Sequence, residues 1–569
     1  MKIIFTIAIS LLALNLFAQD TTRKVWLSGA ARGVLFGDQY SLQDGKDSIT
    51  PSRLNNGHTM VDLTANIRPN QNTYINAQLR VRNDYGGFWG GGVTFDLRQL
   101  YVKGVVAKAI RYQLGDINYK LTPYTFFNNN ERVFGQPQIF DVYNQMLHYD
   151  MFYNIDNTWR QQGIAADFAL EFSDIIDEVQ FNAFATRQNP TDFGLTSERI
   201  FYGANVTMIQ SKYFNAGLNY VSIADIIGTS EDTTALRMPV LTTSGAFNYE
   251  TDNWKLGLKT ELGNSRAFVL KDTSFGERAD YFYEIGGRFE MLSSGLYLDI
   301  NYKDVGPGFR SPGAQSLRVN YLANPNFLTR YGRDQDLRQI ALIDFLRDAS
   351  LYNYKLSTNL QTFQPRFGNA EPYGAATPNR RGFTIKAGQV DLKDRWEVEA
   401  QYQNFSEVVG QGTTALRTYN TMRLDGELHA DEFMAGYTRT IDIEFSYWNE
   451  NTTRTGTEAF ENVDFTNSSY SIGLEVETIE KLSVLWGIMS LESDGFEYVS
   501  LRDRNGDIVD FSEYDDNISE SINALGLKYR FSENSSLQFN WQMSQWTDNK
   551  DALPDYQFNQ FALMYNLTF

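Results

Sequence analysis

Residues 535–546 read SSLQFNWQMSQW, and the last residues, 561–569, read FALMYNLTF. In the first stretch an apolar residue alternates with a polar one from Leu537 to Met543. In the second stretch every other residue is apolar up to the last one: Phe561, Leu563, Tyr565, Leu567 and Phe569. A period of two is typical of a β-strand with one apolar and one polar face. The chain therefore ends in two-faced strands.

The same alternation recurs along the chain, for example in residues 74–82 and 396–404. We count about 22 such segments, within a range of 18–24, and the connections between them alternate in length. Even-to-odd connections are short, such as Lys108 or Lys212 alone. Most odd-to-even connections are long: 37–57, 83–94, 120–158, 225–239, 264–278, 305–380, 449–464 and 494–518. A bilayer sorts connections in this way, with short periplasmic turns and longer loops outside.

The fold class predicted from this pattern is all-β, a single large antiparallel transmembrane β-barrel. Its strands, of 11–15 residues, exceed the ~9–11 that cross the hydrocarbon layer at a tilt. Residues 1–18 have a basic start, an apolar core and a small residue at Ala18, which is typical of a signal peptide. We therefore expect the barrel to occupy 19–569, with no separate N-terminal plug domain before its first strand, near Lys24.

The final alternating residues, Phe561 to Phe569, resemble the C-terminal signal by which bacterial outer-membrane barrels are recognised for insertion. We therefore expect a Gram-negative outer-membrane protein in contact with lipid, lipopolysaccharide and the barrel-insertion machinery. A net charge of −19 argues against a nucleic-acid partner. The chain has no cysteine, which excludes disulfides and thiolate sites.

A barrel of about 22 strands encloses a wide lumen, which we expect inward-folded loops or another protein to narrow. The best candidate is 305–380, which carries GPGFRSPG (306–313), a predicted short helix at 336–350 and a net charge of +5 when Arg381 is included. We expect it to face inner-wall carboxylates such as Glu397, Glu399, Asp425 and Glu427. The pore or constriction candidates are Arg80, Arg82, Arg310, Arg330, Arg333, Arg338, Glu397 and Glu399.

Two interpretations of 305–380 remain open: an arginine-lined constriction that selects anions, or a structural plug whose charges are paired internally. The segment 120–158, rich in Tyr and Phe, is a second inward-folding candidate. The predicted loop 494–518 is instead strongly acidic. Its Asp503, Asn505, Asp507 and Asp510 have oxygen ligands at a spacing that fits calcium, although Asn505-Gly506 is also an ordinary tight-turn dipeptide.

Catalysis is not expected. The three histidines, His58, His148 and His429, have no adjacent catalytic or metal-binding motif, and a lone histidine is more often a structural residue. No cofactor motif has the right context, so we predict no cofactor.

LRQLYVKG (97–104) followed by IRYQLGDINY (110–119) resembles the paired strands of alginate-export-type porins, and PYGAATPNRRGFTIKAG (372–388) is similar to large barrels of the Bacteroidota type. The resemblance implies a barrel of the porin superfamily. The arginine-lined export channel of the alginate porins is matched only in part, by Arg80, Arg82, Arg98 and Arg111.

Two functions follow as hypotheses. The first is a porin-like channel or transporter for polar or anionic solutes, gated by inward-folded loops. The alternative is a non-conducting structural or accessory barrel of a secretion or surface-assembly complex.

Overall fold

The computed structural model describes residues 24–42, 52–85, 92–129, 134–140, 161–173, 175–190, 197–227, 234–271, 276–317, 342, 366, 368–502, 508–550 and 555–569. The predicted signal peptide lies outside these ranges. So does the predicted helix 336–350, apart from Leu342, whose side chain is buried. Within the described ranges no helix is long and apolar enough to cross a membrane.

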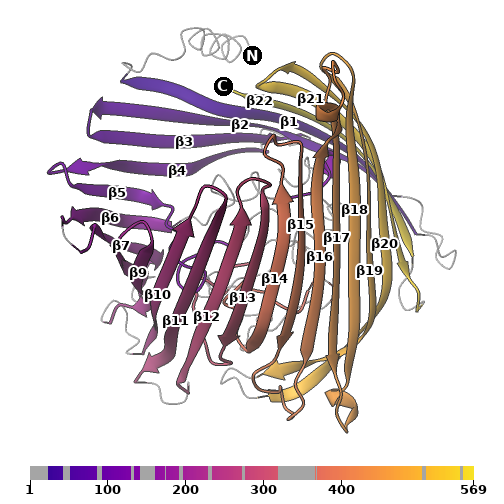
Figure 1. The fold of residues 1–569 in the computed structure, drawn as a ribbon. Coiled ribbons are helices and arrows are strands. Elements are labelled where there is room, and N and C mark those ends of the chain that lie inside the picture. Colours follow the sequence, from indigo (N-terminus) through magenta and orange to yellow (C-terminus); the bar gives the residue numbers. More distant parts are fainter. Residues whose placement is uncertain are drawn as a thin grey trace.

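The chain forms 22 antiparallel strands, and each predicted segment overlaps one of them (Figure 1). They are β1 (Val25–Leu42), β2 (Ser52–Asn70), β3 (Thr73–Asp84), β4 (Val93–Val106), β5 (Ile110–Ile117), β6 (Gln161–Glu171), β7 (Glu178–Asn189), β8 (Arg199–Ile209), β9 (Phe214–Asp225), β10 (Ala235–Glu250), β11 (Trp254–Leu270), β12 (Arg278–Met291), β13 (Leu296–Val305), β14 (Arg380–Val390), β15 (Trp396–Ser406), β16 (Thr418–His429), β17 (Ile441–Arg454), β18 (Val463–Ile479), β19 (Leu482–Arg502), β20 (Ile508–Ser532), β21 (Ser535–Asp548) and β22 (Tyr556–Thr568).

The sheet closes on itself. Every strand pairs with its neighbours in the sequence, and β1 pairs with β22 from Ala30↔Thr568 to Leu42↔Tyr556. Closure removes the edge strands, so the backbone N–H and C=O groups of the wall are paired without water. The predicted fold class, a single large antiparallel barrel of about 22 strands, is confirmed.

The two faces of the wall differ as the alternation predicts. In β21, Gln538 and Asn540 are buried on the inner face, whereas Phe539 between them is exposed on the outer face. Similar exposed apolar side chains occur on strands around the barrel, including Phe95, Ile285, Met422 and Leu525. An apolar outer band over a polar interior is the arrangement of an outer-membrane barrel.

Short even-to-odd and longer odd-to-even connections alternate as predicted, with two differences. The connection β16–β17 covers 430–440 rather than two residues, because β17 begins at Ile441. The predicted acidic loop 494–518 is wrong: β19 and β20 continue to Arg502 and from Ile508, which leaves a connection of only 503–507. Acidic and other polar residues in these strand ends interrupt the apolar alternation that identifies a strand in the sequence.

Candidate functional site: the lumen of the barrel

The connection β5–β6 enters the lumen directly after Ile117, whose side chain is buried in an aromatic cluster on the inner wall. Tyr124 stacks on Phe282 of β12 with ring centroids 3.9 Å apart. Phe126 packs edge-on against Phe201 of β8, at 5.1 Å. The hydroxyl of Tyr124 also donates to Glu284 at 2.6 Å. Burial, followed by the charge of Glu284, raises the pKa of Tyr124 well above its ordinary value, so the phenol stays protonated.

Residues 134–140 of the same connection lie against the opposite wall. The N–H of Gly135 donates to Glu427 of β16 at 3.0 Å, and the N–H of Gln138 donates to Glu444 of β17 at 2.7 Å. Asn540 of β21 donates to the carbonyl of Ile139 at 2.7 Å. Since β5 and β16 are eleven strands apart in a ring of 22, this connection reaches across the barrel (Figure 1).

Glycines on the inner face make room for this crossing segment. A Cβ placed on Gly473 of β18 would lie 2.5 Å from Cβ of Pro137, and one on Gly487 of β19 would lie 2.6 Å from Cγ2 of Ile139. Gly473 and Gly487 are paired directly across the two strands. Glycine in the interior of a strand often marks close approach of another segment.

The connection β13–β14 packs beside the first one. Phe309 and Ala314 are buried in the same aromatic cluster. The N–H of Gly308 donates to Asp280 of β12 at 2.8 Å. The hydroxyl of Ser311 donates to the carbonyl of Tyr124 at 2.7 Å. The two connections are therefore hydrogen-bonded to each other as well as to the wall.

The end of the connection β13–β14 is held by a carboxylate and an arginine. Both backbone N–H groups of Asn369 and Ala370 donate to Glu450 of β17. Arg380 donates to the carbonyls of the same two residues at 2.7 Å each. Its guanidinium also lies 4.2 Å from the ring centre of Tyr419.

Glu371 pairs with Lys303 of β13 and accepts a hydrogen bond from Gln403 at 2.8 Å. Burial alone would raise the pKa of Glu371, but Lys303 and Gln403 outweigh it, and the pKa falls below its ordinary value. Glu371 is therefore ionised at neutral pH and holds the connection to the wall.

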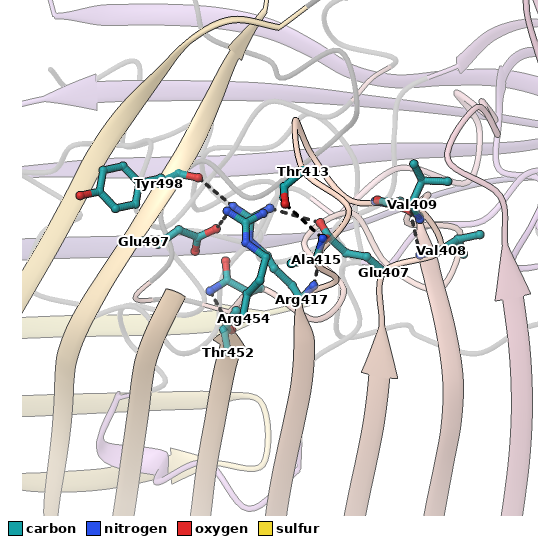
Figure 2. Close-up of polar contacts among 12 residues, drawn as sticks. Glu407, Val408, Val409, Thr413, Ala415, Arg417, Thr452, Arg454, Glu497 and Tyr498 are labelled. Atoms are coloured by element: carbon teal, nitrogen blue, oxygen red, sulfur yellow. Dashed lines mark hydrogen bonds and ion pairs between the residues drawn. The ribbon is translucent and has the colours of Figure 1, made fainter. Parts of the chain in front are cut away.

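Arg417 forms a buried ion network at the end of the barrel that carries the long connections (Figure 2). Its guanidinium lies 3.2 Å from Glu407 and 2.9 Å from Glu497 of β19, and it donates to the carbonyl of Tyr498 at 2.8 Å. Only 2% of the Arg417 side chain is exposed. Burial lowers the pKa of Arg417, but the two carboxylates raise it further than burial lowers it. The network ties the connection β15–β16 to β19.

A cleft of about 350 Å³ opens on the inner faces of β12 to β17 beside residues 371–375. One rung of its wall runs through Lys386, Gln401, Arg423 and Trp448, which are paired in register across four strands. The sequence-based candidates include none of these four residues, because a single charged or amide residue on a strand gives no signal of its cross-strand neighbours.

The arginine candidates lie in different surroundings. Arg80 is buried and binds Asp62 of β2 through two hydrogen bonds, of 2.7 and 2.6 Å. Arg82 pairs with Asp84 at 2.8 Å. Arg310 is buried and donates to the carbonyls of Pro307 and Phe309. Arg330, Arg333 and Arg338 lie outside the described residues.

The acidic candidates bind other partners than the ones expected. Glu399 accepts a hydrogen bond from Tyr297 at 2.6 Å and pairs with Lys386 at 3.4 Å. Glu397 lies one rung nearer the short turns, opposite Glu427. The wall carboxylates that contact the described residues of the connection β13–β14 are instead Asp280, Glu450 and Asp516, the last through Arg366 at 3.8 Å.

Of the calcium candidates, Asp503, Asn505 and Asp507 lie outside the described residues, and Asp510 lies in β20. In the described ranges no group of three or more His, Asp or Glu side chains is arranged to hold a metal ion. His58 is buried in β2, and His148 is not described. His429 bonds Asp442 through Nδ1 at 2.6 Å, at the end of the barrel with the short turns.

The residues of the predicted insertion signal form one row of β22. Phe561 and Tyr565 are exposed on the outer face, with Leu563 and Leu567 in the same row, and the backbone of Phe569 bonds Gly29 of β1. The residues between them, Ala562 and Met564, are buried on the inner face. The row therefore faces the lipid at the closing seam of the barrel.

No protein-family model matches the sequence, and no curated protein matches it. Among solved structures, the chain is similar to the P pilus usher (PapC) translocation pore, at 8% identity over 95% of this chain and 99% of that chain, with a TM-score of 0.38. It is also similar to OccK8 (OprE) of Pseudomonas aeruginosa, at 11% identity over 95% and 98% (TM-score 0.34), and to a BenF-like porin from Pseudomonas fluorescens Pf-5, at 7% over 95% and 99% (TM-score 0.32).

Similarities at these identities concern the fold alone. The closed wall and its apolar outer face carry the conclusion: the chain is a large β-barrel protein of the bacterial outer membrane.

Proposed function

We propose that this barrel is a channel for polar solutes, and that the connections β5–β6 and β13–β14 narrow and gate its lumen. The observation that carries the proposal is that two parts of one connection lie on opposite walls: 118–129 at the aromatic cluster beside β8, and 134–140 at Glu427 and Glu444. Wide barrels leave an aqueous lumen unless a segment fills it. In this proposal the described residues 306–317 and 368–379 add to the constriction as part of a lumen plug.

The wall itself supports a gate rather than a permanent seal, because its 22 strands close without the crossing segment. On the far wall residues 134–140 are held by hydrogen bonds to Glu427, Glu444 and Asn540 and by the burial of Ile139 and Phe140 in an apolar cluster. A segment of this kind opens at a lower free energy than the barrel itself. The finer resemblance to alginate-export-type porins, and selection for anions, stay predictions.

Recording from purified protein in planar lipid bilayers tests the channel. We expect stepwise current through the wild-type protein. No current at any voltage, either before or after replacement of 306–379 by a short turn, would contradict the proposal and favour the accessory-barrel alternative.

A disulfide tests the gate, since the chain has no cysteine of its own. The 2.6 Å between Cγ2 of Ile139 and a Cβ on Gly487 places the two Cβ atoms near the ~3.8 Å of a disulfide. In the variant Ile139→Cys/Gly487→Cys we expect opening events to be lost after oxidation and restored by reductant, with Gly487→Cys alone as control. Opening that ignores oxidation in a fully cross-linked sample would rule out movement of this segment as the gate.

A further inference from the structure

The cleft beside residues 371–375 has the dimensions and chemistry of a solute-binding site. Its volume of about 350 Å³ lies in the range of small-ligand sites. Four neighbouring strands, β14 to β17, supply the rung Lys386, Gln401, Arg423 and Trp448. The cleft thus lies on the inner wall where a permeating solute would pass.

Charge in the cleft is balanced. Lys386 lies 3.4 Å from Glu399, and Arg423 lies 2.6 Å from Asp425. Lys303 is paired with Glu371. An incoming anion would meet a carboxylate beside each of these cations, so Coulomb attraction gives little net preference for anions.

The remaining hydrogen-bonding capacity comes from neutral groups. Gln401 lies between Lys386 and Arg423 in the rung, and its amide makes no hydrogen bond to any described residue. The adjacent rung continues this surface with Thr384, Gln403 and Thr421, paired in register. A side-chain amide offers two donors and one acceptor oxygen, which matches a pair of neighbouring hydroxyl groups.

Trp448 lines one end of the rung, where 5% of the residue is exposed. An aromatic ring beside amides and hydroxyls gives an amphipathic surface, apolar at the ring and polar around it. A pyranose ring is amphipathic in the same way, with C–H groups on its faces and hydroxyls at its edge. We propose that this cleft binds an uncharged, polyhydroxylated solute of the size of a mono- or disaccharide, an inference that rests on the proposed channel function for its biological meaning.

Equilibrium binding tests the inference independently of conduction. Isothermal titration of the purified full-length protein in detergent would use glucose, maltose and sucrose as neutral probes and glucuronate as the matched anion. We expect saturable binding of at least one neutral saccharide, no tighter binding of glucuronate than of glucose, and at least a tenfold loss of affinity in Gln401→Leu. The control Gln180→Leu, on the inner face of β7, should bind as the wild type does.

Glucuronate bound tenfold more tightly than glucose would overturn the inference, and so would the absence of saturable binding by all three neutral saccharides. An unchanged affinity in Gln401→Leu would show that the saccharide binds elsewhere than in this cleft. The failures are separable. Saccharide binding by a barrel that never conducts would contradict the proposed channel but support the binding site. Conduction without saccharide binding would contradict the binding site but support the channel.

Discussion

Ile139 lies against Gly487, so close that a Cβ on the glycine would come within 2.6 Å of the isoleucine Cγ2. The first residue belongs to a connection that leaves the wall at β5, and the second to β19 on the other side of the barrel. The contact therefore makes the position of the crossing segment sensitive to the size of the residue at 487.

Replacement of Gly487 by Ile should displace the crossing segment. The added side chain occupies the space of Ile139, and overpacking of this kind costs about 1–3 kcal/mol. Because the barrel wall is unaffected, we expect a larger mean conductance and faster proteolysis within 134–140, with unchanged heat-modifiable migration of the barrel. In the control Gly245→Val, the nearest atom to the Cβ is 3.7 Å away, and neither readout should change. Equal effects of both substitutions would contradict the contact.

Removal of the Arg417 charge should destabilise the barrel strongly. Arg417→Met leaves the carboxylates of Glu407 and Glu497 buried without their cation, and breaking a buried ion pair in this way costs about 3–5 kcal/mol. Denaturant unfolding monitored by tryptophan fluorescence measures the loss. Adding Glu407→Gln and Glu497→Gln should recover much of it, whereas a triple variant as unstable as the single one would show that packing, not charge, dominates.

The pairing of Lys303 with Glu371 predicts a pH dependence. The pKa of Glu371 lies below its ordinary 4.5, so its ionised form stabilises the folded state above pH 4.5 and this contribution is lost as pH falls through the lowered pKa. Lys303→Met removes the cation that lowers it. The difference in unfolding free energy between wild type and variant should therefore be largest above pH 4.5 and shrink below it. A difference that stays constant or grows on acidification would refute the pairing.

The pairing of Arg80 with Asp62 predicts that Arg80 does not select anions. In the double variant Asp62→Asn/Arg80→Gln both charges are lost together, so the reversal potential in a KCl gradient should not change. The single variant Arg80→Gln should be destabilised instead, because Asp62 is fully buried. A marked shift of the double variant towards cation selectivity would restore Arg80 as a selectivity residue.

Strand positions could be predicted from the sequence because the evidence for each strand lies in its own residues and in the connections beside it. The alternation in 535–546 indicates a strand with an apolar and a polar face. The short connections at Lys108 and Lys212 indicate the end of the barrel at which each turn lies. Both depend only on neighbouring residues. The acidic extension of β19 and β20 was missed because polar residues on both faces give no alternation.

Contacts inside the lumen could not be predicted, since they join residues far apart in the chain. Arg417 looks like any loop arginine until β19 brings Glu497 beside it. Gly473 and Gly487 did leave a signal, because glycine weakens a strand interior and is kept there where another segment approaches. The signal shows that something lies against the wall and does not identify Pro137 and Ile139 as the residues that do.

Replacement of both inward connections tests the central claim most directly. Ile117 pairs with Gln161, and Val305 pairs with Arg380, so 118–160 and 306–379 can each be replaced by a short hairpin turn without a change in register. If these connections narrow the lumen, the double replacement should conduct several-fold more current per open channel than the wild type and lose its gating transitions. An intact barrel with the wild-type conductance after both replacements would contradict the account.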